Sequence, residues 1–224
     1  MTCLNRSFFL MKTFVTADRY LPTKNNSRDG GYDLKARVTE DHKYVTECLL
    51  KHLSLQKMLK TETDLFINGN LVENSHIEDT LETCLLDEKG FYALLPGQSV
   101  RVHTGFYVTS PGLPEETQDK LVEMGIGRLV HIGRIQPRSG LAKHGISVAN
   151  TPGLDDMETY GGEILVLLEN RSCDVHLFGD GARIAQFTFE MVADMGDLSK
   201  YLVRDEVDLG ATVRGPRGFG SSGV

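Results

Sequence analysis

This 224-residue sequence lacks long apolar runs and paired metal-binding cysteines. Its four cysteines, at positions 3, 48, 84 and 173, form no C-x-x-C pair and have no histidine at zinc spacing. The longest apolar run near the start, residues 8–11, is too short for a signal sequence or a membrane span. Scattered thiols are typical of reducing compartments. We therefore expect a cytoplasmic protein (or, if it is viral, one of the host-cell cytoplasm or nucleus) with no membrane partner.

Positive charge is also in short supply. The chain has 24 Lys and Arg side chains against 31 Asp and Glu, which gives a net charge of −7. A protein that coats nucleic acid needs a basic surface, so we expect no nucleic-acid partner. Hydrophobic residues make up 40% of the chain and charged residues 25%, which is typical of a globular protein rather than a disordered one. The length favours one large domain, or a domain with an insertion.

The acidic excess is concentrated in residues 39–91, which hold 11 acidic and 5 basic side chains. Apolar residues recur at helical spacing over 43–60 and 77–85, and a capping box at 75–78 precedes the second run. Asn68–Asn70 between them has the composition of a turn. We therefore predict a helical acidic insertion on the outside of the protein, away from any anionic ligand. Leu49, Leu53, Leu81 and Leu85 should face its own small core or the wall of the main domain. Replacing 41–88 by a short Gly/Ser linker should then keep the assembly intact and its activity within a few-fold, because loop-closure cost changes slowly with length. A protein-contact surface is one role open to the insertion.

The remaining chain favours β-structure. Apolar and polar residues alternate over 100–108 and 184–191, and 164–168 is a short run typical of a buried strand. Turns rich in Gly and Pro separate these runs, which favours a β-sandwich or barrel. A short helix is expected at 115–124, because the segment begins with Pro-Glu-Glu and ends at a glycine.

Five short glycine-rich segments carry side chains suited to a phosphorylated sugar. They are residues 30–34, 137–142, 153–163, 181–186 and 214–222. Their arginines can make bidentate contacts to phosphate oxygens, and their serines and glycines offer hydroxyl and backbone N–H donors. Their carboxylates can activate water, and their aromatic rings can stack on a sugar or base. Together they predict a site for a nucleoside polyphosphate, closed by a glycine-rich tail.

These five segments, in this order, resemble the five motifs of the trimeric deoxyuridine triphosphatase (dUTPase) family. The resemblance covers residues 12–38 and 92–224 and includes PRSGLA, ARIAQF and RGPRGFGSSG. It implies a mainly β fold, a jelly-roll-like barrel or sandwich, and a homotrimer with shared active sites. It also implies Mg²⁺-assisted hydrolysis of dUTP to dUMP and pyrophosphate, which limits uracil in DNA and supplies dUMP for thymidylate synthesis.

The resemblance divides the chain into three parts. Residues 1–38 and 92–213 would form the β domain, and residues 39–91 the helical acidic insertion. Residues 214–224 would form a flexible arm that closes over the active site, and the arm of one subunit would cap a site built mainly by the two others.

The resemblance also assigns roles to individual residues. Asp156 is the expected general base that activates the attacking water, and Asp33 supports Arg183 and the waters around Mg²⁺. Gln186 is expected to bond phosphate or the attacking water. No side chain is expected to bind the metal directly, because the triphosphate and water would hold it. The expected substrate-binding residues are Arg138, Ser139, Gly140, Asn150, Gly153, Tyr160, Arg183, Arg214, Phe219, Gly220, Ser221 and Ser222.

The third segment departs from the family pattern at two places. Three residues separate Asp156 from Tyr160, one more than usual, which affects base selectivity more than phosphate handling. Asp155 stands where the family has an apolar residue, and we expect it to be a surface hairpin residue. Elsewhere, we expect His103 and His131 to be half-exposed strand residues.

Two alternative functions remain open from the sequence. A dCTP deaminase shares the implied fold and trimer, but Gly140 and Lys143 stand where that family has a serine and an arginine. A dUTP-binding regulatory protein that acts through the insertion is the second alternative. A panel of nucleotide substrates would separate these functions.

Overall fold

The computed structural model of the chain describes residues 11–38, 64–72, 90–196 and 199. Its strands are β1 (Lys12–Val15), β2 (Tyr32–Lys35), β3 (Leu65–Ile67), β4 (Asn70–Val72), β5 (Phe91–Leu94), β6 (Ser99–Thr109), β7 (Arg128–Pro137), β8 (Ile146–Val148), β9 (Gly153–Asp155), β10 (Glu163–Asn170), β11 (Val175–Gly179) and β12 (Arg183–Asp194). Its helical segments are a 3₁₀ turn at Asp18–Tyr20, α3 (Glu115–Glu123) and α4 (Ser139–Ala142). The predicted mainly β fold is confirmed. The strands expected from alternation are β6 and β12, and the short buried run at 164–168 lies in β10.

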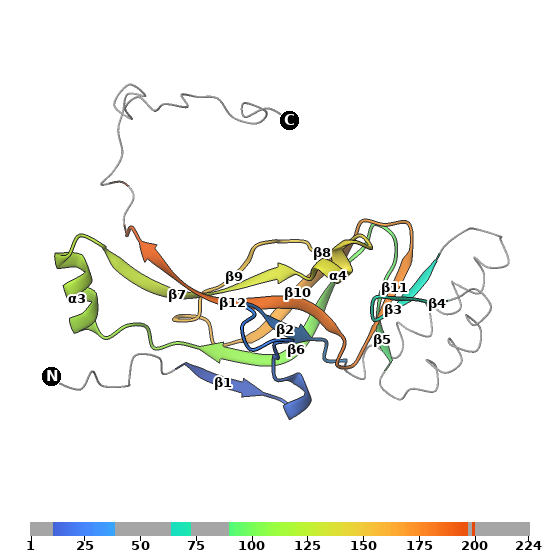
Figure 1. Cartoon of the computed structure of the whole chain (residues 1–224), viewed down its shortest axis with the longest axis horizontal. Helices are drawn as coiled ribbons and strands as arrows, with labels where there is room; N and C mark the ends of the chain where they lie inside the picture. Colours follow the sequence, from blue (N-terminus) through green and yellow to red (C-terminus); the bar gives the residue numbers. More distant parts are fainter. Residues whose placement is uncertain (1–10, 39–63, 73–89, 197–198, 200–224) are drawn as a thin grey trace, which may run out of the picture.

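The described strands form three four-stranded sheets. Their orders are β1-β6-β10-β8, β2-β12-β7-β9 and β4-β3-β11-β5. Figure 1 shows the third sheet at the end of the molecule opposite α3. The long antiparallel pair of β7 and β12 runs from Arg128 opposite Asp194 to Pro137 opposite Ala185. This pair ends at the second and fourth glycine-rich segments, and it therefore brings them side by side.

The main hydrophobic core draws side chains from all three sheets. On β10, Ile164, Val166 and Leu168 are buried, while the residues between them are more exposed, as the strand period of two requires. They lie in one cluster with Val102 of β6 and Phe187 of β12. Burial of such a side chain contributes about 1.5–3 kcal/mol, so the core fixes the two sheets that carry the site.

Residues 64–72, within the stretch expected to form a helical insertion, form a β-hairpin instead. β3 and β4 make the two strands, and the predicted turn at Asn68–Asn70 lies between them. β3 also pairs in parallel with β11, so the hairpin belongs to a sheet of the β domain. The helical expectation is therefore wrong for 64–72, where Leu65 and Phe66 are buried on β3. The predicted helical runs at 43–60 and 77–85 lie outside the described residues.

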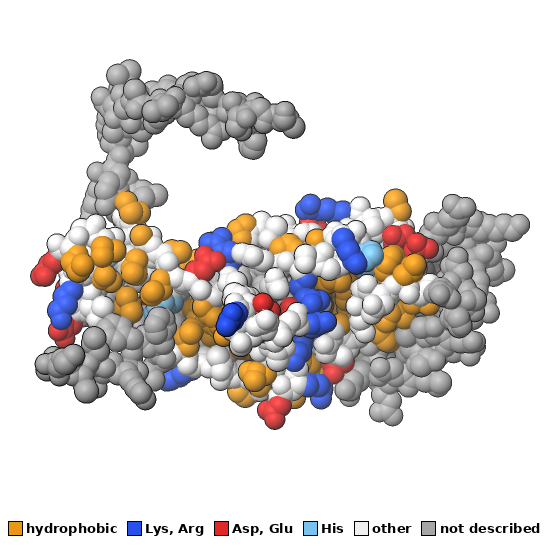
Figure 2. Space-filling model, in the orientation of Figure 1, with side chains coloured by type: hydrophobic (Ala, Val, Ile, Leu, Met, Phe, Trp, Pro, Cys, Tyr) orange, Lys and Arg blue, Asp and Glu red, His pale blue; other side chains and the backbone are white. Residues whose placement is uncertain are grey.

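The predicted short helix is confirmed as α3, which packs against β7. The side-chain amide of Gln118 bonds both the N–H and the carbonyl of Leu129, at 2.9 and 2.6 Å. Figure 2 shows hydrophobic side chains gathered at this end of the molecule. Val122, Met124 and Ile126 are exposed there. Exposed apolar clusters of this kind are typical of contact surfaces between proteins.

Among the described residues, no helix has both the length and the apolar character to span a membrane.

Candidate active site

A buried carboxylate with two arginine partners lies at the centre of the candidate site. Asp33, on β2, is 2% exposed. Its Oδ1 accepts a hydrogen bond from Nε of Arg138 at 2.9 Å, and its Oδ2 accepts one from Nη1 of Arg183 at 3.3 Å. A carboxylate out of water needs such partners, because an unpaired buried charge is strongly destabilising. The contact with Arg183 was expected from the sequence, whereas the contact with Arg138 was not.

Strand register explains why these residues meet. Gln186, on β12, lies opposite Asp33 of β2 on one side and opposite Gln136 of β7 on the other. Arg183 begins β12, and Arg138 follows the end of β7. The Nη1 of Arg138 also donates to the Arg183 carbonyl at 3.2 Å. Both guanidinium groups are therefore held at one edge of the sheet, which suits an anionic ligand.

An open pocket of about 590 Å³ lies beside this edge. Its lining residues are Arg134, Gln136, Pro137, Ser139, Ala142, Thr151, Pro152, Gln186 and Glu190. Two expected site residues, Ser139 and Gln186, are among them. Sequence reasoning missed Arg134 and Glu190, which form an ion pair at 2.8 Å. Their only sequence signal is opposite charge on two strands whose pairing is not evident without the register.

The second glycine-rich segment runs from the last residue of β7 through Arg138 to the end of α4. Arg138 precedes the helix in an extended conformation, and Ser139 and Gly140 are exposed at its start. A Cβ on Gly140 would meet nothing within 4 Å, so the fold of one chain does not require glycine there. The absence of a side chain keeps the backbone N–H open to an approaching phosphate.

The connection from β8 to β9 joins two sheets and carries two expected substrate-binding residues, Asn150, expected at the uracil edge, and Gly153. Asn150 is exposed at its turn, and Gly153 is buried at the start of β9. A Cβ on Gly153 would lie 3.2 Å from Nδ2 of Asn150, so glycine lets the Asn150 amide lie against the backbone. β9 in turn pairs with β7, and Thr151 and Pro152 of this connection line the pocket.

Asp155 is buried, which corrects the expectation of a surface hairpin residue. Gly153 and Asp155 face inward on β9, while Leu154 between them is 61% exposed. Asp155 lies opposite Gly133 of β7, and a Cβ on that glycine would come within 3.2 Å of the Asp155 Cβ. Burial raises the pKa of Asp155 to about 6, and the charge of Asp156 acts in the same direction. No hydrogen bond to its Oδ2 is found in the described part of the chain.

The extra residue in the third segment is absorbed by a single turn. The carbonyl of Asp156 accepts hydrogen bonds from the N–H groups of Thr159 and Tyr160, at 2.9 and 2.8 Å. Met157 is buried within this turn, while Asp156 itself is exposed. Tyr160 is 45% exposed and lies over Gly162, where any Cβ would clash with its ring. The turn therefore leaves Asp156 exposed and Tyr160 nearly half exposed.

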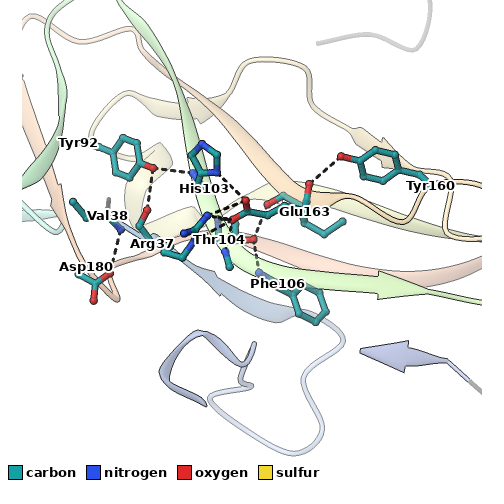
Figure 3. Close-up of polar contacts among 11 residues, drawn as sticks. Arg37, Val38, Tyr92, His103, Thr104, Phe106, Tyr160, Glu163 and Asp180 are labelled. Carbon is teal, nitrogen blue, oxygen red and sulfur yellow. Dashed lines mark hydrogen bonds and ion pairs between the residues drawn. The ribbon is translucent and has the colours of Figure 1, made fainter. Parts of the chain in front are cut away.

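Figure 3 shows that Tyr160 adjoins a buried polar network. The Tyr160 hydroxyl donates to the Glu163 carbonyl at 3.1 Å. The Glu163 carboxylate accepts hydrogen bonds from Arg37 at 3.1–3.3 Å and from the Gly105 N–H at 2.6 Å, and lies 2.8 Å from Nδ1 of His103. Burial works to raise the pKa of Glu163, but hydrogen bonds from His103, Arg37 and Gly105 outweigh it and lower the pKa. Glu163 is thus a structural partner for donors on β6 and for Arg37, which follows β2.

The two histidines expected to be half-exposed differ from each other. His103 is half-buried, with its side chain 32% exposed, as expected. His131 is buried, which corrects the expectation. Its Nδ1 lies 2.6 Å from the Ser110 hydroxyl, and its backbone N–H donates to Glu158 at 2.7 Å. Glu158 lies in the lengthened third segment. Its contact with His131 explains why this residue of β7 is buried.

Five expected site residues lie outside the described residues. They are Arg214, Phe219, Gly220, Ser221 and Ser222. Within the described part of the chain, no group of three or more His, Cys, Asp or Glu side chains is arranged to hold a metal ion. Each oxygen of Asp33 has an arginine partner, and the one acidic residue that lines the pocket, Glu190, is bonded to Arg134. The hydroxyl and amide groups of the pocket fit a hydrated metal better than a directly bound one.

Comparison with known proteins identifies the family. The dUTPase family model matches residues 115–223, which include the second to fifth glycine-rich segments. The deoxyuridine 5'-triphosphate nucleotidohydrolase of Helicobacter hepaticus is 37% identical over 139 residues, covering 59% of this chain and 84% of that protein. The protein of that name from Rhizobium johnstonii is 36% identical over 140 residues, covering 62% of this chain and 74% of the relative. The chain therefore belongs to the dUTPase family.

Solved structures agree with this fold. The Staphylococcus bacteriophage 80alpha dUTPase with dUPNHPP matches with a TM-score of 0.53 at 15% identity, covering 96% of this chain and 98% of that chain. A mutant of the same phage enzyme with dUpNHpp matches with a TM-score of 0.52 at 14% identity, over the same shares. At such low identity these matches support the fold alone.

Proposed function

We propose that this protein is a dUTP diphosphatase, which hydrolyses dUTP to dUMP and pyrophosphate. The observation that carries the proposal is the buried Asp33 with its two arginines, Arg138 and Arg183, at the edge of a pocket that contains Ser139 and Gln186. This arrangement suits a triphosphate, because it fixes cationic donors before the anion arrives. The named activity of the relatives supports the same conclusion.

In the proposed reaction, water attacks the α-phosphorus of dUTP. A new bond forms between the water oxygen and the α-phosphorus, and the bond from that phosphorus to the α–β bridging oxygen breaks. Pyrophosphate leaves, and the proton of the water passes to the Asp156 carboxylate. Arg138, Ser139 and Gly140 hold the phosphate chain, and Gln186 orients it or the water. Mg²⁺, when bound to the triphosphate, neutralises part of the phosphate charge.

The active site is proposed to form between copies of the chain in a homotrimer. Asp156 is not among the residues that line the pocket beside Asp33, although both are assigned to one reaction. The exposed apolar residues Val122, Met124 and Ile126 also favour association with another surface. Arg214 and Phe219 of the arm would complete the site. We also propose that the protein is cytoplasmic and that residues 39–91 offer a surface for contact with another protein.

A nucleotide panel tests the activity. Purified protein with Mg²⁺ is given dUTP, dCTP, dTTP or UTP, and the products are separated by chromatography. We expect dUMP and pyrophosphate from dUTP, with the other three nucleotides cleaved far more slowly. Release of dUTP and ammonia from dCTP would show a deaminase instead. Binding of dUTP without turnover would indicate a regulatory protein.

A further inference from the structure

Hydrogen bonds fix the β3–β4 hairpin to the β domain. β3 pairs in parallel with β11, so that Phe66 lies opposite His176. At the hairpin turn, the Asn68 N–H donates to the Leu177 carbonyl at 2.8 Å. The side-chain oxygen of Asn68 accepts the Gly179 N–H, also at 2.8 Å. The side-chain amide thus extends the pairing past the end of β3, and the hairpin is held in one register.

One face of this hairpin touches α4. The ring of Phe66 lies 4.7 Å from that of His144, two residues after α4, and stacks on His176 at the same centroid distance with an interplanar angle of 9°. At the turn, a Cβ on Gly69 would lie 2.9 Å from Cδ2 of Leu141. Leu141 belongs to α4 and is only 3% exposed. The hairpin therefore contacts α4 in its middle and just beyond its end.

The geometry of α4 depends on such contacts. The helix is a single turn of four residues, and an isolated turn of this length is unstable because nucleation costs more than one hydrogen bond returns. Its first residues, Ser139 and Gly140, are exposed, and Leu141 is the residue that packs inward. The position of the Ser139 hydroxyl and the Gly140 N–H is thus set by what Leu141 packs against.

We propose that the β3–β4 hairpin positions the phosphate-binding loop 138–142 through two contacts, Phe66 against His144 and Gly69 against Leu141. The inference rests on the proposed function, since it concerns how the loop holds a triphosphate. Phe66 and Gly69 are positioning residues, because they act through Leu141 and His144. Their loss weakens binding of the triphosphate chain more than binding of the nucleoside.

The first test compares a triphosphate ligand with a monophosphate. The α,β-imido analogue of dUTP and dUMP are each titrated, with Mg²⁺, into the full-length wild type, Phe66→Ala and Val175→Ala. Val175 is the matched control, because it is 1% exposed on β11 and belongs to the core cluster on the other face of the same sheet. We expect Phe66→Ala to raise the Kd of the imido analogue roughly tenfold and that of dUMP less than about twofold. Val175→Ala should leave the ratio of the two Kd values unchanged.

A pair of glycine variants gives a second test. Gly69→Ala places a methyl group against Leu141 at a φ of +82°. Gly125→Ala is the control, since its φ is +76° but a Cβ there meets nothing within 4 Å. Both variants strain the backbone, and only the first displaces Leu141. We expect Gly69→Ala alone to weaken binding of the imido analogue relative to dUMP.

A double-mutant cycle tests the contact between Phe66 and His144. His144→Ala should raise the Kd of the imido analogue about as much as Phe66→Ala. The double variant should add little, because both substitutions remove the Phe66–His144 contact, through which Phe66 acts on the loop. His144→Phe keeps a ring there and should restore affinity. If Phe66→Ala and Gly69→Ala shift the ratio no more than their controls do, the positioning role is wrong. A wild type that neither binds nor hydrolyses dUTP would instead contradict the proposed function.

Discussion

Asp155 and Asp156 are consecutive residues in opposite environments, the first buried beside Gly133 and the second exposed at the following turn. Residues alternate between two faces along β9, so that Gly153 and Asp155 face the core. The strand ends there, and Asp156 lies in the turn that follows. A carboxylate that activates water must reach both water and substrate, which the exposed one can do. The buried one is left with an influence on stability rather than a direct part in the reaction.

Asp156→Asn should lower turnover of dUTP by about 10²–10⁴-fold while leaving the Kd of the imido analogue nearly unchanged. An amide cannot accept the proton of the attacking water, but it occupies the same space. Single-turnover kinetics with Mg²⁺ measure the first quantity, and titration calorimetry measures the second. Turnover within twofold of the wild type would remove Asp156 from the mechanism, and Asp155→Asn would then be tested as the base.

Asp155→Leu should change how stability depends on pH. The pKa of Asp155 rises from 3.8 to about 6 on folding, so the folded protein retains a proton between about pH 4 and 6 that the unfolded chain has released. The stability from this group is therefore lost as pH rises through that window. About two pKa units correspond to a loss of about 3 kcal/mol. Relative to the wild type, Asp155→Leu should gain stability as pH rises from 4 to 6, measured by urea unfolding at one protein concentration.

His176 gives the opposite slope in nearly the same window. It is fully buried between Phe66 and Phe178, and burial lowers its pKa from 6.5 to about 4. The unfolded chain binds a proton there that the folded protein does not, so stability from this group is lost as pH falls from about 6.5 to 4. His176→Phe is thus the matched comparison for Asp155→Leu, with an effect of opposite sign. Identical pH profiles for both variants and the wild type would show that neither group titrates as described.

Much of the fold follows from local patterns in the sequence. Strand alternation over 100–108 predicts β6, and a start with Pro-Glu-Glu and a glycine stop predict α3. The β3–β4 hairpin was missed because each strand has only three residues, and the partner of β3 lies about 110 residues away on β11. No local period records such a pairing, although the short apolar run Leu65–Ile67 is compatible with it.

The candidate site, too, could be predicted only in part from the sequence. The motifs name Asp33, Arg138 and Arg183, but their contacts depend on which residues face each other across β2, β12 and β7. The burial of Asp155 had a usable signal, since an apolar residue stands at this position in the family and such a position faces inward. The polarity of the aspartate obscured it. The arginine partner of Glu163, Arg37, had no such signal, because the two lie 126 residues apart.

Glu163→Gln should destabilise the protein by about 3 kcal/mol. The substitution removes the charge that pairs with Arg37 and turns one acceptor oxygen into a donor that faces the Gly105 N–H or His103. Glu169→Gln is the control on the same strand, because the partner of Glu169, Arg171, is 66% exposed and such pairs contribute little. Urea unfolding at pH 7 measures both. Equal midpoints would mean that the Glu163 network adds no more than a surface ion pair.

Removal of residues 214–224 should abolish most dUTP turnover while the proposed homotrimer stays folded. The segment lies outside the described residues, and the expectation comes from its four glycines and from the residues it supplies, Arg214 and Phe219. A glycine-rich arm adds little to a core, so its loss should not change the size of the assembly in light scattering. Phe219→Ala is the point-variant control and should lose part of the activity. Full activity of the truncated protein would exclude the arm from the site.

Two linker replacements separate the hairpin from the rest of the acidic stretch. Replacing 41–88 by a Gly/Ser linker removes Leu65 and Phe66, which are 3% and 6% exposed, and removes β3 from the edge of β11. Loss of these core side chains should lower the unfolding midpoint, and loss of the contact with α4 should weaken binding of the imido analogue roughly tenfold. This reverses the expectation from the sequence that a short linker can replace 41–88 with little effect. A second variant replaces only 41–61 and 75–88 and keeps the hairpin. It should bind the analogue within a few-fold of the wild type, since the net charge of −6 on 39–91 repels a triphosphate rather than binding it. If the two variants bind the analogue equally well, the hairpin has no part in the site, and if both lose binding, residues outside the hairpin complete it.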